Sequence, residues 1–162
     1  MRKGLKNITA LFLCLIMLVA TSSVVLAEGV DDVGKVVDGS KLTLDKSAET
    51  VINSLVKGNI LNQGTARITN NENGTVNVFG AVYGSVKCDK LTLSLTLQRY
   101  SDGYWYNVDT YGDSAYNTTS MSRSYNVGVA RGYYYRIKGA CIAQKGSTTE
   151  SQSPVTSGIW VG

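Results

Sequence analysis

The segment from Leu91 to Tyr100 constrains the fold most strongly, because apolar and polar residues alternate in it with a period of two. A helix cannot place this pattern on one face, whereas a strand can, because successive side chains point to opposite sides of a sheet. One set is therefore expected to line a core, namely Leu91, Leu93, Leu95 and Leu97. The other set is expected on the opposite face and comprises Thr92, Ser94, Thr96, Gln98 and Tyr100.

The first 27 residues have the organisation of a secretory signal peptide. A basic start is followed by an apolar run from Ile8 to Ala20, and Val25-Leu26-Ala27 resembles a small-residue cleavage site. We therefore expect Sec-type export, with residues 1–27 removed, residues 28–40 forming a flexible leader and residues 41–162 forming one β-sandwich domain. The alternative is an uncleaved N-terminal anchor.

Charge and composition make several functional classes improbable on physical grounds. Processing would remove three of the sixteen basic residues and none of the twelve acidic ones, leaving a formal net charge of +1. Charge therefore gives no case for nucleic-acid binding. The chain has no histidine, which is a common general base and metal ligand. We expect no enzymatic activity, no metal or other cofactor, and no membrane association after cleavage; a hydrolase using two carboxylates is the alternative.

Two cysteines, Cys88 and Cys141, lie in the expected domain. Two thiolates cannot form a four-cysteine zinc site, so a disulfide is the natural interpretation in an exported protein. Each cysteine also shares the sequence phase assigned to the core side of its strand. We therefore expect a Cys88–Cys141 disulfide between two layers, with two buried free thiols as the alternative.

Strand patterns and turn residues follow one another through the rest of the domain. Residues 48–56 are compatible with a short helix or an extended segment, and Gly80 and Gly84 suggest bulges or close backbone contacts. Polar loops are expected over residues 112–119 and 144–154. Strands are expected near residues 66–69, 75–86, 91–100, 104–111, 120–127, 133–143 and 155–161, and residues 41–44 are compatible with a short edge strand. About seven short strands of this kind indicate an all-β fold, a single antiparallel immunoglobulin-like β-sandwich.

Asp102-Gly103 predicts the turn of a central hairpin. A two-residue turn would pair Leu97 with Val108 and direct Trp105 outward beside Tyr100. The residues then expected on the leucine side are Tyr104, Tyr106 and Val108. A three-residue turn with a glycine bulge would instead bring Trp105 inward. We favour the two-residue turn because it buries Val108 and exposes its polar neighbours.

The aromatic residues are the most informative candidates for a function, because all ten tyrosines and both tryptophans lie beyond residue 27. Several are expected beside polar side chains on an outer face, where flat rings suit sugar rings, peptides or another protein. The candidate binding residues are Gln98, Tyr100, Trp105, Tyr134 and Arg136. The alternative is that aromatic and arginine side chains simply cover one another through cation–π contacts.

Three stretches resemble one protein family. Val37–Thr43 resembles its entry segment, Leu97-Gln98-Arg99 followed by Asp102–Trp105 resembles its central hairpin, and Gly132–Arg136 resembles its late strand. The family comprises small exported proteins of clostridial-type Gram-positive bacteria and is known as a domain of unknown function. The resemblance implies an exported immunoglobulin-like β-sandwich and supplies no catalytic residues.

These features predict a secreted, non-enzymatic binding module of the bacterial cell envelope or medium. Its partner is expected to be an extracellular glycan, peptide or protein. The alternative is a secreted bacteriocin-like or signalling protein, which small size, export and the lack of catalytic residues suggest.

Overall fold

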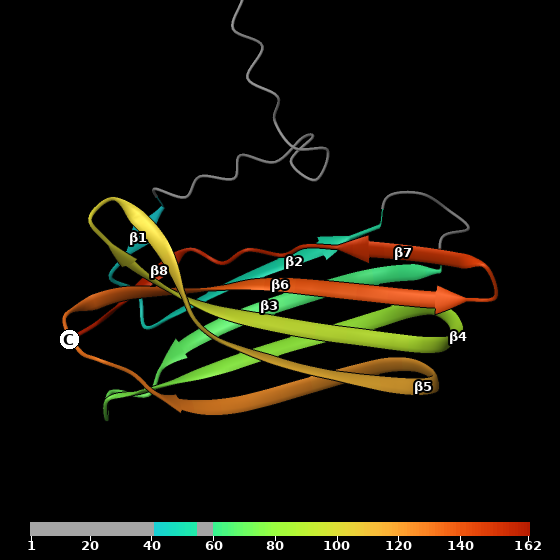
Figure 1. Cartoon of the computed structure of the whole chain (residues 1–162), viewed down its shortest axis with the longest axis horizontal. Helices are drawn as coiled ribbons and strands as arrows, with labels where there is room; N and C mark the ends of the chain where they lie inside the picture. Colours follow the sequence, from blue (N-terminus) through green and yellow to red (C-terminus); the bar gives the residue numbers. More distant parts are fainter. Residues whose placement is uncertain (1–40, 55–59) are drawn as a thin grey trace, which may run out of the picture. The chain divides into compact units, whose positions relative to one another are not determined.

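The computed structural model describes residues 41–54 and 60–162, which belong to the compact unit Val36–Gly162 (Figure 1). These residues form an all-β structure, as predicted, and contain no helix. Accordingly, no helix that is long and apolar enough to cross a membrane occurs within these two ranges. The predicted signal peptide over residues 1–27 and leader over residues 28–40 lie outside the described residues.

The described chain contains eight strands, where about seven were expected. In chain order they are β1 (Leu42–Thr43), β2 (Ser47–Asn53), β3 (Leu61–Asn70), β4 (Thr75–Ser101), β5 (Tyr104–Gly128), β6 (Tyr133–Lys145), β7 (Thr148–Gln152) and β8 (Gly158–Val161). They form one sheet with the order β1-β8-β6-β4-β3-β2, to which β5 is added beside β4 and β7 beside β6. The β1–β8 pair is parallel, and the other pairs are antiparallel.

The long hairpin of β4 and β5 runs through both halves of a curled sheet. The first half of β4 pairs with β3 and the end of β5, and its second half pairs with β6 and the start of β5. The pairing shifts register between Tyr83 and Cys88, where the two halves join. The halves then face one another, because a Cβ atom on Gly80 would lie only 2.6 Å from Leu95 Cδ2. The close contact predicted at Gly80 is therefore confirmed.

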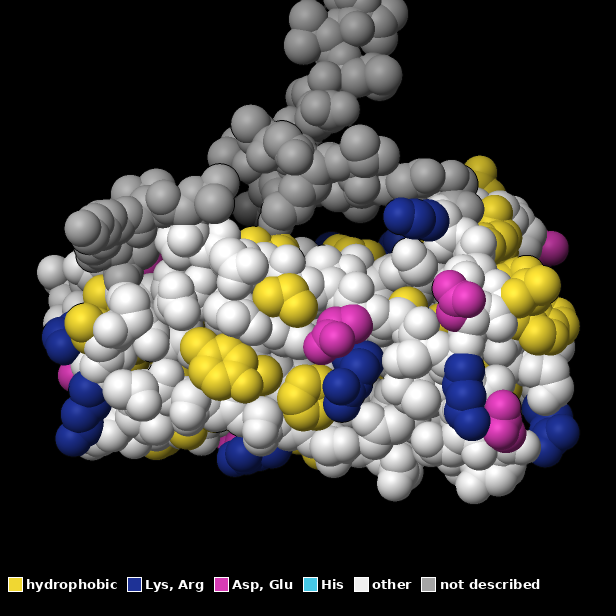
Figure 2. Space-filling model, turned by 180° about the vertical axis from the view of Figure 1, so that it is seen from behind, with side chains coloured by type: hydrophobic (Ala, Val, Ile, Leu, Met, Phe, Trp, Pro, Cys, Tyr) yellow, Lys and Arg dark blue, Asp and Glu magenta, His cyan; other side chains and the backbone are white. Residues whose placement is uncertain are grey.

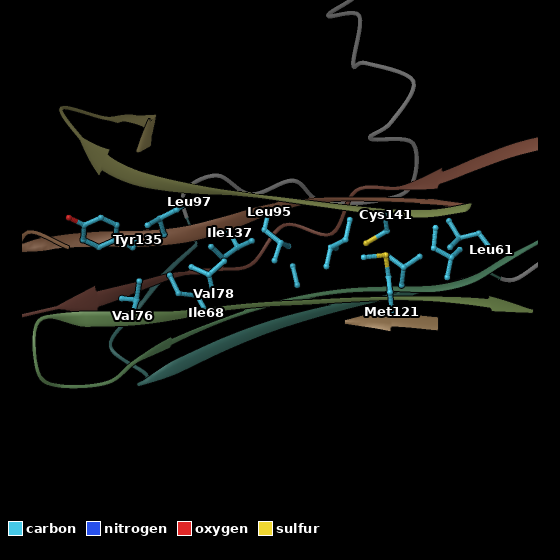
Figure 3. Packing of buried hydrophobic residues seen from close by; sticks show 14 of the residues in the cluster. Leu61, Ile68, Val76, Val78, Leu95, Leu97, Met121, Tyr135, Ile137 and Cys141 are labelled. Carbon is cyan, nitrogen blue, oxygen red and sulfur yellow. The ribbon is translucent and has the colours of Figure 1, made fainter. Parts of the chain in front are cut away.

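The core lies between these facing halves. Figure 3 shows Leu95, Leu97 and Ile137 on one side pointing toward Ile68, Val76 and Val78 on the other. The four leucines of the alternating segment are all buried, as predicted. Burying each stabilises the fold by about 1.5–3 kcal/mol relative to an exposed side chain.

Three segments are strands where the sequence left another option or indicated a loop. Residues 47–53 form β2, so the helical alternative is wrong over the described part of residues 48–56. Residues 112–119 continue β5, and residues 148–152 of the expected second loop form β7. The backbones of these segments pair with β3, β4 and β6, and such pairing overrides a weak local preference.

The β4–β5 hairpin has the expected two-residue turn but a different register. Asp102 and Gly103 both have positive φ values, 52° and 85°, as turns matching the twist of a hairpin require. A bulge next to Leu97 then pairs this residue with Asp109 and leaves Val108 as the extra residue. Val108 is 48% exposed. The side chains expected to be buried but found exposed are Tyr104, Tyr106 and Val108.

Cys88 and Cys141 are buried free thiols, so the predicted disulfide is wrong. Cys141 pairs with Leu93 of β4, and Cys88 precedes Leu93 by five residues in that strand, a separation of about 16 Å. A disulfide needs Cα atoms within about 7 Å of each other. Both cysteines face the core, as their phase predicted. Cys141 of β6, however, lies opposite Leu93 and not opposite Cys88, so the two thiols are at different levels of the sheet. Burial raises the pKa of the Cys141 thiol to about 11 and also raises that of Cys88.

Candidate binding surface

Four aromatic residues lie opposite one another across four neighbouring strands. Trp105 of β5 pairs with Tyr100 of β4, Tyr100 pairs with Tyr134 of β6, and Tyr134 pairs with Trp160 of β8. The ring centroids are 5.1 Å apart in the Tyr100–Trp105 pair and 5.0 Å apart in the Tyr134–Trp160 pair, both tilted. We call these four residues together with Arg136 the aromatic surface.

A chain of polar contacts supports the aromatic surface from below. Gln98 Nε2 donates to Asn107 Oδ1 at 2.8 Å, and Arg136 Nε donates to Gln98 Oε1 at 2.8 Å. The Arg136 guanidinium lies 4.2 Å from the centroid of the Trp105 ring. Burial lowers the pKa of Arg136, although a guanidinium remains a cation in proteins. Gln98 was expected to face solvent, but it is only 8% exposed. Its side chain instead lies under Arg136 and accepts the hydrogen bond of that residue.

Trp105 has a close-fitting seat on β8. A Cβ atom on Gly158 would lie 2.6 Å from Trp105 Cη2 and 3.0 Å from Leu42 Cδ2, so a side chain larger than hydrogen would displace the ring. This contact requires the closed end of the β4–β5 hairpin to bend toward β8 and β1, as Figure 1 shows. Trp105 is half-buried: it lies beside Tyr100 and outside the core, as the two-residue turn predicted, but its ring packs against Gly158 and Arg136.

The structure thus brings together all five residues predicted for the site. The contact between Arg136 and Trp105 follows the alternative in which arginine and aromatic side chains cover one another. Trp160 is 38% exposed and is therefore more accessible than the half-buried Trp105, although it was missing from the predicted set. Its signal in the sequence is the alternation with Ile159 and Val161, which are both buried.

The polar groups in contact with this surface include the Arg136 guanidinium and the side-chain amides of Gln98 and Asn107. Groups of three or more histidine, cysteine, aspartate or glutamate side chains that could hold a metal ion are absent from residues 41–54 and 60–162. On the face shown in Figure 2, hydrophobic side chains form separate groups, with acidic and basic side chains interspersed among polar atoms. The aromatic surface is therefore equipped to bind by ring stacking and hydrogen bonding.

No protein-family model matches this chain, and no curated protein matches it. The resemblance to the exported clostridial family therefore stays a prediction.

Proposed function

We propose that this protein is a secreted, non-enzymatic binding module of the bacterial cell envelope or medium, and that its aromatic surface binds a glycan. The observation that carries this proposal is the cross-strand row formed by Trp105, Tyr100, Tyr134 and Trp160. Rings with an apolar face and a polar edge suit ligands that combine apolar faces with hydroxyl groups. A sugar ring has both of these features.

The support beneath the row favours binding because it fixes the rings before a ligand arrives. Trp105 is seated on Gly158, and Arg136 is tied to Gln98. Side chains that are already ordered lose little conformational entropy on association. Tyrosine and tryptophan also supply a large contact area with few rotatable bonds.

The proposal includes the finer fold prediction, an immunoglobulin-like β-sandwich. Its support is the facing of the two halves of β4 and the alternation of buried and exposed residues along β4 and β6. In a sandwich, the aromatic surface would occupy the outer side of one layer. Export rests on the predicted signal peptide, and protein recovered from the medium should then begin at Glu28. The bacteriocin-like or signalling alternative rests on size and export and not on this surface.

Retention on purified peptidoglycan and on a glycan array tests the proposed ligand. The variants Trp160→Ala and Tyr134→Ala should each weaken retention at least tenfold, because each removes an accessible ring of the row. Tyr116→Ala is the matched control: Tyr116 is 66% exposed and pairs with Lys90, about 33 Å along β4 from Tyr100. Equal retention of all variants, or binding to peptides alone, would overturn the glycan assignment.

A further inference from the structure

Strand β5 has a long backbone edge that faces away from the sheet. Among the described strands it pairs with β4 alone, and its 25 residues contain no proline. An edge strand with unpaired backbone groups is a template for pairing with another chain. Natural proteins therefore protect such edges, and β5 has a specific form of protection.

Two side-chain contacts show which backbone groups of β5 point away from β4. Thr96 Oγ1 lies 3.2 Å from Thr110 Oγ1, and Thr92 Oγ1 lies 3.1 Å from Ser114 Oγ. Side chains approach most closely at the non-hydrogen-bonded pairs of an antiparallel ladder. The backbone N–H groups of Thr110 and Ser114 therefore point to the open edge, and that of Gly112, midway between them, does so too.

Aspartate carboxylates cover two of these three edge groups. The Thr110 N–H donates to Asp109 Oδ1 at 2.8 Å, and the Ser114 N–H donates to Asp113 Oδ1 at 2.7 Å. Each carboxylate oxygen accepts the hydrogen bond that the carbonyl oxygen of an incoming strand would otherwise accept. The edge is thus blocked at two alternate positions by the residue that precedes each of them.

Further contacts hold the two carboxylates in place. The Tyr111 hydroxyl donates to Asp109 Oδ2 at 2.8 Å, and Arg123, from the second half of β5, donates to Asp113 Oδ2. The hydrogen bond from the Ser114 N–H, followed by that from Arg123, lowers the pKa of Asp113. Asp113 is therefore held in its carboxylate form at neutral pH.

The charges of the two guards also oppose pairing between two copies. An antiparallel, two-fold pairing centred on Tyr111 would bring Asp109 of one copy opposite Asp113 of the other, at both ends of the segment. Like charges directly opposite one another destabilise a strand pair. Without the carboxylates, the same register pairs Thr110 of each copy with Gly112 of the other, so it joins these two outward N–H groups of each copy to a partner of identical sequence.

We propose that Asp109 and Asp113 are edge guards, and that the segment from Asp109 to Asp113 is the docking site of a second copy of this chain once the guards are removed. A second copy fits because two-fold pairing of the same segment satisfies the edges of both chains. Val108, which is exposed, lies beside the segment and would be covered in the pair.

Light scattering combined with size-exclusion chromatography of the full protein tests this proposal. The double variant Asp109→Ala/Asp113→Ala should dimerise at a concentration at least tenfold lower than the parent protein. Amide hydrogen exchange at residues 110 and 112 should then slow as protein concentration rises. Adding Gly112→Pro to the double variant removes the middle N–H and should abolish the association.

Two further variants separate the guards from other effects of the same residues. Arg123→Ala breaks the ion pair with Asp113 but keeps both carboxylates, and Asp45→Ala removes an exposed acid outside β5; both should behave as the parent protein does. Asp109→Ala alone, which leaves the Arg123–Asp113 ion pair in place, should dimerise weakly. The proposal is overturned if the guard variants stay as monomeric as the parent, if their association survives Gly112→Pro, or if they bind added peptides but not themselves.

Discussion

β4 and β5 are antiparallel partners of nearly equal length, 27 and 25 residues, yet their environments differ sharply. β4 has neighbours on both sides along most of its length and places a row of leucines in the core. β5 pairs on one side, and Met121 is its one buried residue. The comparison shows that a polar segment can form a strand when it hydrogen-bonds along its length to a neighbouring strand that is held in place by the core. It also separates two contributions, because β4 is stabilised by burial and β5 mainly by backbone pairing.

The largest expected effect comes from removing apolar volume in β4. Leu95→Ala should lower the free energy of unfolding by about 2–5 kcal/mol, because the side chain packs between the facing halves of the sheet. Val108→Ala in β5 should change it by about 0.5 kcal/mol or less, because this residue is exposed. Urea denaturation of both variants measures the contrast, and similar losses would refute the proposed division between the strands.

An intermediate effect is expected at the contact between Trp105 of β5 and Gly158 of β8. Gly158→Ala introduces a Cβ atom into the seat of Trp105 and should destabilise the protein by about 1–3 kcal/mol. Tryptophan fluorescence should change in the folded variant, because the indole must move. Gly128→Ala is the control, since a Cβ atom there meets nothing within 4 Å. Unchanged fluorescence and stability in Gly158→Ala would show that the ring does not depend on this glycine.

The smallest effect is expected at the open side of β5 and depends on pH. Partial burial, followed by the hydrogen bond to Asp109, raises the pKa of Tyr111 to about 12. The resulting stabilisation is complete below the unfolded pKa near 10 and is lost as pH rises through about 12. In Tyr111→Phe, the alkaline decrease in stability over this range should be smaller than in the parent. Equal pH profiles of unfolding free energy would contradict the raised pKa.

Local alternation was sufficient to predict the parts of the fold that border the core. The leucines of residues 91–97 and the inward residues of β6 are buried because their phase leaves one face apolar. Polar residues 112–119 carry no such signal, and their strand depends on the ladder offered by β4. The missing disulfide has a similar cause, because phase predicts which side of a strand a cysteine faces but not its distance from a second cysteine.

The candidate site followed the same rule. Outward phase and aromatic character were enough to select Tyr100, Trp105 and Tyr134, which do lie together. The burial of Gln98 depends on Arg136 from another strand, and the position of Trp160 depends on β8 lying beside β6. The burial of Gln98 and the position of Trp160 both depend on how strands from distant parts of the chain align, and the local sequence pattern does not predict that alignment.

The two-residue turn at Asp102-Gly103 has a consequence for how the chain folds. From Ser101–Tyr104 at the tip to Thr75–Gly128 at the far end, most β4–β5 pairs can form next to a pair that already exists, and the ladder is interrupted only at the register shifts beside Leu97 and between Cys88 and Tyr83. Loop closure is then needed only at the tip, and residues 53 positions apart meet without a separate search. Strand pairing between distant residues ordinarily makes β proteins slow to fold. This chain therefore has a route in which its longest strand pair forms progressively from a single starting point.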